Sequence, residues 1–234
     1  MLHPFEIVTL ITVAAFTVLG SAANSFIVVV NVIDWVKTRY LNSNDIILTS
    51  LGIVKFFFQW ILMMSTILNT VCPNLHTLAK ILPVISPTWN CLDFTNIWFA
   101  ALLSIFYWTK IASHSHHIFI FLKLKFPRIV PWLLLGSMLV SLVISIPTTW
   151  IFKNLNSNST IDLCSNNSSI LNCSLAWNLY KGHQGSPSFF VSSVVHAAYP
   201  SLHSVILILS NSKFRQVLER IFLHAEVPSG EDIT

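Results

Sequence analysis

The polar side chains that could do chemistry are few, and they interrupt otherwise apolar stretches of the sequence. Lys55 is the single charged residue in the run 46–68. Such a lysine either contacts polar groups of neighbouring helices or belongs to an ion pathway. Trp89 and Asp93 are four residues apart, which places them on one helical face. An indole offers a rigid apolar wall and a carboxylate favours a cationic ligand; the alternative is interfacial anchoring by Trp89 beside a hydrated Asp93.

The histidines do not form a metal site by their spacing. His196 and His203 are seven residues apart, two turns along one helical face, and no further ligand is in register for zinc. We interpret His114, His116 and His117 as part of a solvated basic loop rather than a metal cluster. The sequence also lacks the G-x-S-x-G, P-loop and H-E-x-x-H motifs. We therefore predict no enzyme activity, no metal and no cofactor.

Composition indicates the environment in which these side chains lie. Of the 234 residues, 54% are hydrophobic and 9% are charged, whereas an ordinary soluble domain has about 25% charged residues. So few charges exclude a soluble enzyme or nucleic-acid-binding protein, and 17 Phe with 8 Trp exclude a disordered chain. The net charge of +4 is therefore not a nucleic-acid signal. We predict an all-α, polytopic membrane protein without a nucleic-acid partner.

Five apolar runs are long enough to span a bilayer, which needs about 20 residues per helix. They cover residues 7–33, 46–68, 92–111, 129–152 and 189–210. The first run lacks a basic n-region and is too long for a signal peptide, so we expect an uncleaved helix. We expect a helical bundle over 1–223, with an outer loop at 153–187 and a cytoplasmic tail at 224–234. Within this bundle, 214–223 has the alternation of a short amphipathic helix.

Charge placement predicts the orientation of the chain. With the amino terminus outside, the inner segments 34–45 and 112–128 and the chain after 211 hold most of the basic residues. The inner residues are Lys37, Arg39, Lys123, Lys125, Arg128, Lys213, Arg215 and Arg220, and the outer ones are Lys80, Lys153 and Lys181. This bias follows the positive-inside rule. We therefore predict an extracellular amino terminus and a cytoplasmic carboxyl terminus.

The predicted outer loop carries further topological signals. It contains N-glycosylation acceptor patterns at Asn158, Asn166, Asn167 and Asn172. Their clustering agrees with the predicted orientation, and low complexity of a loop tip is the alternative. The cysteines lie in or beside the outer segments, at Cys72, Cys91, Cys164 and Cys173, where disulfides are permitted. A bond from Cys91 to Cys164 or Cys173 would hold the loop over the helix ends; the sequence does not choose between this bond and free thiols.

Two runs of sequence resemble a known receptor family. Residues 98–112 read WFAALLSIFYWTKIA, close to the family's helix-three pattern W-F/L-A-T-x-L-S-x-F-Y-x-x-K-I-A. Residues 199–213 read YPSLHSVILILSNSK, close to its helix-seven pattern Y-P-S-x-H-S-x-I-L-I-L-x-N-x-K. Asn24 and the run 44–49 match its first and second helices. The chain thus resembles the bitter taste receptors (taste receptor type 2), which are G-protein-coupled receptors. The matches cover most of residues 1–150 and 197–223.

The chain departs from this family in its number of helices. The family has seven, whereas five are predicted here, because 153–187 leads straight into a run that resembles the seventh helix. The fifth and sixth helices are the missing pair, and the loss of two consecutive spans preserves the direction of the last helix. The sequence also has Lys55 where the family usually has Arg, and Asp93 where it usually has Asn.

The resemblance implies roles for individual residues. Asn24 and Lys55 are expected to form a structural polar lock with the seventh helix. Trp89 and Asp93, together with His196, are expected to bind ligand. The G-protein-facing residues are expected to be Tyr107, Lys110, Lys123 and Lys125, and attraction of these basic loops to anionic lipid is the alternative. The helix-seven motif consists of Tyr199, Pro200, His203, Ser204 and Asn211, with His203 in a structural hydrogen bond.

The resemblance also implies a function. A complete receptor of this kind binds small bitter-type organic ligands from the extracellular side and couples to a heterotrimeric G protein. Because activation needs the sixth helix, we expect this chain to be truncated and impaired in signalling. The alternative is a non-signalling subunit that joins an intact receptor in an oligomer; a transporter or membrane enzyme would require accidental motif matches. We expect the chain in the plasma membrane if exported, and otherwise in the endoplasmic reticulum.

Overall fold

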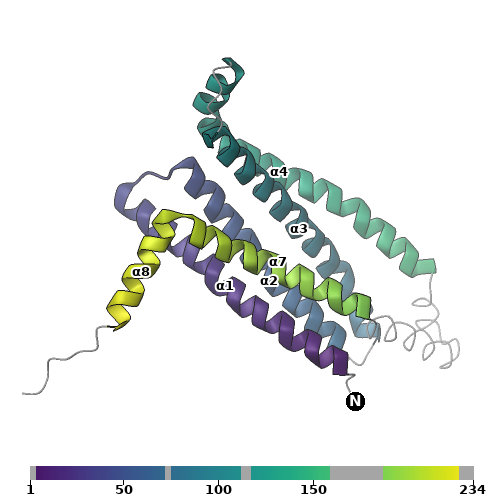
Figure 1. Cartoon of the computed structure of the whole chain (residues 1–234). Helices are drawn as coiled ribbons and strands as arrows, with labels where there is room; N and C mark the ends of the chain where they lie inside the picture. The colour runs from purple at the N-terminus through teal and green to yellow at the C-terminus, as the bar shows by residue number, and fades with distance from the viewer. Residues whose placement is uncertain (1–3, 72–74, 112–116, 159–186, 227–234) are drawn as a thin grey trace, which may run out of the picture.

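The computed structural model describes residues 4–71, 75–111, 117–158 and 187–226, and the regular elements within these ranges are helices. They are α1 (Pro4–Thr38), α2 (Ser43–Val71), α3 (Leu75–Ile111), α4 (His117–Asn158), α7 (Pro187–Ser210) and α8 (Ser212–Glu226), as drawn in Figure 1.

Among the described residues, five helices are long and apolar enough to cross a membrane. Their candidate spans are Glu6–Thr38, Ser43–Leu68, Pro87–Thr109, Arg128–Pro147 and Val191–Ser210. The predicted fold class, an all-α membrane bundle with five spanning helices, is therefore confirmed.

The helices are longer than the apolar runs that predicted them. α1 begins at Pro4, whose fixed φ suits a first helical turn, and Glu6 in that turn interacts favourably with the helix dipole. It ends at Thr38, before Arg39 adopts a left-handed φ of 57°. α4 continues to Asn158, so residues 153–158 of the predicted outer loop are helical. Backbone hydrogen bonds do not depend on apolar side chains, and a helix can therefore continue beyond its apolar part.

Successive spanning helices run in alternating directions, as Figure 1 shows. α2 packs against α1 on one side and α3 on the other, and α3 also packs against α4. α7 packs mainly against α1 and also touches α2. α8 turns sharply away from the end of α7 and contacts α1 (Figure 1). The helix that follows α4 in the described chain thus lies against the first two helices.

Two glycines allow side chains and backbones to approach closely between α1 and α2. A Cβ added at Gly52 would lie 3.1 Å from Cγ2 of Val28 and 3.3 Å from the carbonyl oxygen of Asn24. A Cβ added at Gly20 would collide with the amide group of Gln59. The absence of a side chain at these positions lets α2 and its polar groups reach the surface of α1.

The outward surface of the bundle is apolar. On α4, Trp132 is 73% exposed, Val143 is 67% exposed and Ile146 is 66% exposed. Large exposed apolar surfaces are unusual on soluble monomers, whereas lipid tails are a suitable environment for them. The exposure of these side chains agrees with a helix in contact with lipid.

Candidate functional site

A buried polar network joins α1, α2 and α7 at the level of Lys55. The Lys55 side chain is fully buried, and its Nζ lies 2.5 Å from Nδ1 of His203 and 3.4 Å from Oγ of Ser204. The Ser204 Oγ lies 2.6 Å from Oδ1 of Asn24 and 2.8 Å from the carbonyl oxygen of Pro200. A hydroxyl has one proton, so Ser204 shares it between these two acceptors while accepting from Lys55. Ser204 therefore connects the lysine of α2 to the asparagine of α1.

The His203 contact specifies a tautomer when Lys55 is protonated. An ammonium group has three donors and no acceptor, so Nδ1 of His203 must accept and the ring proton must be on Nε2. The ring of Tyr199 stacks on that of His203, with centroids 5.7 Å apart and planes 19° apart. The predicted lock residues Asn24 and Lys55 are thus brought together through Ser204, with His203 as a further partner.

A second polar layer lies one helical turn from the first. Gln59 and Ser201 are both fully buried, and Nε2 of Gln59 lies 2.6 Å from Oγ of Ser201. The Ser201 hydroxyl lies 2.8 Å from the carbonyl oxygen of Phe16, which is also 3.4 Å from the Gln59 amide. Sequence reasoning did not identify this layer. The signal was present, because Gln59 is four residues after Lys55 and therefore lies on the same face of α2.

A third cluster connects the carboxyl end of α1, the start of α2 and the start of α8. The Nζ of Lys213 lies 2.6 Å from Oδ2 of Asp34, 3.4 Å from Oδ2 of Asp45 and 3.0 Å from Oδ1 of Asn31. The Asn31 amide in turn donates to Oγ1 of Thr49 at 3.0 Å. The start of α8 therefore meets the junction of α1 and α2, which is far from it in sequence, around one ammonium group.

Asn211 and Phe214 fix the direction of α8. The Asn211 Oδ1 accepts a hydrogen bond from the backbone nitrogen of Lys213 at 3.1 Å, as an N-cap does. The Phe214 ring is fully buried and meets Phe26 of α1 edge to face, with centroids 6.3 Å apart. The predicted amphipathic segment is thus a helix whose first turn is attached to the bundle.

The predicted ligand-binding residues lie where α2, α3 and α7 meet. The indole of Trp89 is 5.5 Å from the ring of His196, between centroids, and stacks on Phe58 of α2 at 6.3 Å. Its Nε1 is buried and has no hydrogen-bond partner in the described part of the chain. Asp93 is partly buried one turn further along α3 and interacts electrostatically with His196. The structure thus brings the three predicted residues together.

The predicted G-protein-facing residues are only partly described. Tyr107 is half-buried and its ring packs edge to face against Phe106 at 6.1 Å, between centroids. Lys125 is exposed. Lys110 and Lys123 are within α3 and α4, but their side chains lie outside the described residues.

Several predictions for the outer side also concern residues outside the described ranges. Asn158 is the last residue of α4, whereas Asn166, Asn167, Asn172, Cys164 and Cys173 lie beyond the described ranges. Within those ranges, Cys91 has a free, partly buried thiol. The proposed disulfide and glycosylation therefore stay predictions. No group of three or more metal-ligating residues occurs in the described part of the chain.

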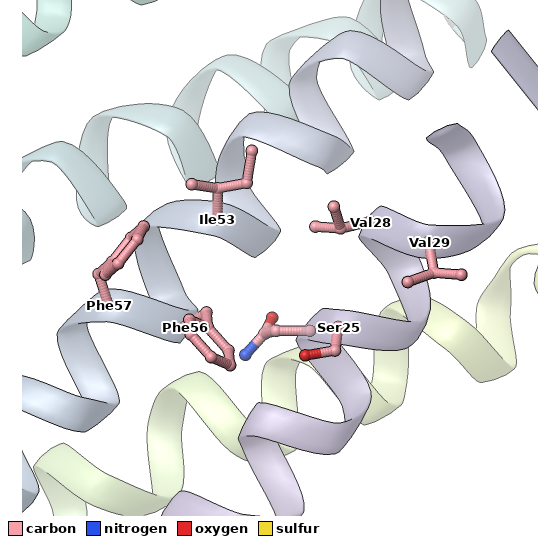
Figure 2. Close-up of a pocket in the computed structure, with 7 residues that line it drawn as sticks. Ser25, Val28, Val29, Ile53, Phe56 and Phe57 are labelled. Atoms are coloured by element: carbon pink, nitrogen blue, oxygen red, sulfur yellow. The ribbon is translucent and has the colours of Figure 1, made fainter. Parts of the chain in front are cut away.

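A shallow groove opens between α1 and α2 beside the polar network of Lys55, with a volume of about 200 Å³ (Figure 2). Figure 2 shows Val28 and Val29 of α1 on one side, and Ile53, Phe56 and Phe57 of α2 on the other. Asn24 also lines it, and its Nδ2 has no hydrogen-bond partner among the described residues. Sequence reasoning did not find this groove, because it depends on how the two helices pack.

These helices and their buried polar contacts define a multi-pass helical membrane protein. The sequence model described as "Taste receptor protein (TAS2R)" matches residues 1–181 and 168–226. The chain belongs to this family, the bitter taste receptors, which are G-protein-coupled receptors and not enzymes. The predicted family is thereby confirmed.

The curated relatives are named as taste receptors. Taste receptor type 2 member 8 of Pongo pygmaeus is 34% identical over 146 residues, which are 62% of this chain and 47% of that protein. Member 7 of Papio hamadryas is 36% identical over 139 residues, which are 59% of this chain and 43% of that protein. Member 7 of Pongo pygmaeus is 36% identical over 148 residues, which are 63% of this chain and 45% of that protein. The matched part of this chain thus corresponds to less than half the length of each relative.

Proposed function

We propose that this bitter taste receptor-like chain recognises small organic molecules from the extracellular side and does not itself activate a G protein. The observation that carries the proposal is the position of α7. This helix contains the family's helix-seven motif and packs on α1 and α2 through the contacts of Lys55 with His203 and Ser204. In the described chain α7 is the element that follows α4, and the family's fifth and sixth helices have no counterpart among the five candidate spans found there.

Signalling impairment follows from the way such receptors switch. Activation requires a bundle with two alternative packings, one of which is stabilised by ligand. In this family the sixth helix is expected to move outward, and the proposal holds that this helix is missing. We expect cells that express only this chain to give no calcium response to bitter agonists, while cells with a full-length relative respond. A calcium response from this chain alone would overturn the proposal.

Ligand recognition is proposed for Trp89, Asp93 and His196. Trp89 provides an indole wall with a free donor, and Asp93 provides a partly buried carboxylate that favours a cation. An aromatic amine should therefore bind more tightly than its neutral isostere, as measured by quenching of tryptophan fluorescence. Asp93→Asn should reduce this preference by roughly tenfold or more, because the attraction between the carboxylate and the ammonium is lost although the amide oxygen can still accept a hydrogen bond.

The matched control for Asp93→Asn is Glu219→Gln. Glu219 is 62% exposed on α8, so its substitution removes the same charge away from the three helices that meet at Trp89. The preference for the amine should be unchanged in this variant. An equal preference in wild type and Asp93→Asn would refute the role of the carboxylate.

The second candidate function is that of a non-signalling subunit of a receptor oligomer. The outward face of α7 favours it, because Tyr199 is 48% exposed, Leu202 is 50% exposed and Ile206 is 58% exposed. This face could pack against a helix of an intact receptor instead of lipid. Co-precipitation with a full-length relative, together with a change in the surface level of that relative, supports this function. Absence of both effects at matched expression excludes it.

The orientation is also part of the proposal. The amino terminus is proposed to be extracellular, the carboxyl terminus cytoplasmic, and the segment between α4 and α7 extracellular and glycosylated. The distribution of basic residues and the clustered acceptor asparagines support this arrangement. The chain resides in the plasma membrane if exported and otherwise in the endoplasmic reticulum.

A further inference from the structure

A cavity of about 600 Å³ lies between the carboxyl end of α1 and the face of α8. Its charged lining consists of Lys37 and Asp34 from α1 with Lys213 and Arg220 from α8. Its apolar lining includes Ile33 of α1 and Ile221 of α8. The cavity is therefore basic on balance and amphipathic, and its residues are distinct from those of the Lys55 network and the Trp89 region.

The three cations are not equivalent. Lys213 is held in place by Asp34 at 2.6 Å, by Asp45 at 3.4 Å and by Asn31 at 3.0 Å. Lys37 and Arg220 also line the cavity, and neither has an ion-pair partner among the described residues. One cation thus orders the cavity wall, and two others present positive charge that a ligand can neutralise.

The position of the cavity indicates where its ligand comes from. Lys37 is in the last turn of α1, at the end of the candidate span Glu6–Thr38. On the α8 side, Ile221 is 52% exposed, and the adjacent Phe222 and Leu223 are 60% and 63% exposed. A site where a span ends and exposed apolar side chains meet cations is suited to a molecule with a charged head and apolar tails.

We propose that this cavity binds the headgroup of a phosphorylated phosphatidylinositol, with Lys37 and Arg220 contacting its phosphate monoesters. Arg220 offers the planar fork of donors that matches a phosphate, and Lys37 adds a point charge. Two unpaired cations match the several negative charges of a phosphorylated inositol headgroup better than they match the single net negative charge of phosphatidylserine. Ile33 and Ile221 then contact the acyl chains, which distinguishes a lipid from a free inositol phosphate. The choice of this inner-leaflet lipid rests on the cytoplasmic orientation of the carboxyl terminus proposed above.

The test uses the full chain in detergent micelles, where no membrane surface potential is present, and counts bound lipids by native mass spectrometry. Phosphatidylinositol 4,5-bisphosphate, phosphatidylserine and phosphatidylcholine are compared. Loss of a direct hydrogen bond between charged groups weakens binding by roughly tenfold or more, so Lys37→Gln with Arg220→Gln should weaken bisphosphate binding by about a hundredfold. The free inositol trisphosphate should compete poorly, because it lacks the acyl chains.

The matched control is Arg39→Gln with Arg215→Gln, which removes the same formal charge from the same two segments outside the cavity. Arg215 is 61% exposed beside Glu219, and neither arginine lines the cavity. This control variant should bind phosphatidylinositol 4,5-bisphosphate with an affinity within about twofold of that of the wild type. Thermal unfolding of each variant verifies the fold, and Ile33→Trp, which fills the cavity without changing charge, should also weaken binding.

Three results would overturn the proposal. An equal loss in both double variants would mean diffuse attraction to basic residues, and no loss in the Lys37 and Arg220 variant would place the lipid elsewhere. Binding of phosphatidylserine as tight as that of the bisphosphate would refute the headgroup. None of these results depends on ligand recognition or signalling. Failure of the proposed receptor function would therefore leave the lipid measurement unaffected. If the proposed orientation of the chain is wrong, the accessibility of tags at its two ends would show this separately.

Discussion

Substitution of Lys55 perturbs the network between α1, α2 and α7 most directly. The lysine contacts His203 and Ser204, and both contacts are lost in Lys55→Met, which keeps most of the side-chain volume. Hydrogen bonds between membrane helices contribute about 0.6 kcal/mol on average and up to about 1.7 kcal/mol. Two such bonds predict a destabilisation of roughly 1–3 kcal/mol for Lys55→Met. Lys55→Ala should be more damaging by about 2 kcal/mol, because it also leaves a cavity.

The assay is thermal unfolding of the purified chain in detergent, followed by intrinsic fluorescence and accompanied by the surface level in cells. Arg128→Ala is the control, since Arg128 is exposed. A double-mutant cycle with Lys55→Met and Ser204→Ala should give a coupling energy of about 0.5 kcal/mol or more, because the two side chains are in one network. If Lys55→Ala leaves both the unfolding temperature and the surface level unchanged, the network does not hold the bundle together.

Two further predictions concern the packing of α1. Gly20→Ala should destabilise the chain by about 1–3 kcal/mol, because its Cβ collides with the Gln59 amide, which can move away only by giving up its buried hydrogen bond to Ser201; Gln59→Ala in the same chain should relieve the clash. Gly136→Ala, whose Cβ meets nothing within 4 Å, is the control in the same unfolding assay, and an equal effect of both substitutions would refute the clash. Phe214→Ala should detach α8 and lower the protection of its amides in hydrogen exchange, since loss of a fully buried Phe costs about 3–5 kcal/mol. Phe222→Ala, at a side chain 60% exposed, should leave this protection unchanged, and equal protection in both variants would contradict the attachment.

Sequence patterns were sufficient for the helices because the signal for each span is local. A continuous apolar run is recognisable without knowledge of its neighbours, and the five spans were predicted on this basis. Most helix ends were not predicted, as α4 illustrates by continuing to Asn158. The length of an apolar run reflects the thickness of the bilayer core, whereas the end of a helix depends on capping and backbone hydrogen bonds.

The candidate site was predictable only where a motif was present. Asn24 and Lys55 were expected to interact with the seventh helix, and the structure places Ser204 between them. Their role as a lock stays a prediction until Lys55 is substituted. The Gln59 and Ser201 layer was missed, because the pairing of these residues depends on how α2 and α7 are rotated against each other.

The cluster of Asp34, Asp45 and Lys213 was missed for a related reason. Asp34 and Asp45 were considered only as part of the inner segment 34–45, and Lys213 only as an inner charge. Their meeting requires α8 to turn back towards α1, which no local pattern specifies. The basic cavity beside them could therefore not be predicted from the sequence either.

The accessibility of tags at the two ends of the chain is the decisive measurement for the proposed topology. The chain is proposed to have five spans, with an extracellular amino terminus and a cytoplasmic carboxyl terminus. An amino-terminal tag should therefore be stained on intact cells, or protected inside sealed microsomes if the chain is retained, and a carboxyl-terminal tag should show the opposite accessibility. Two tags on the same side would require an even number of spans and would contradict the bundle. A carboxyl-terminal tag stained on intact cells would contradict the orientation on which the receptor and lipid proposals rest.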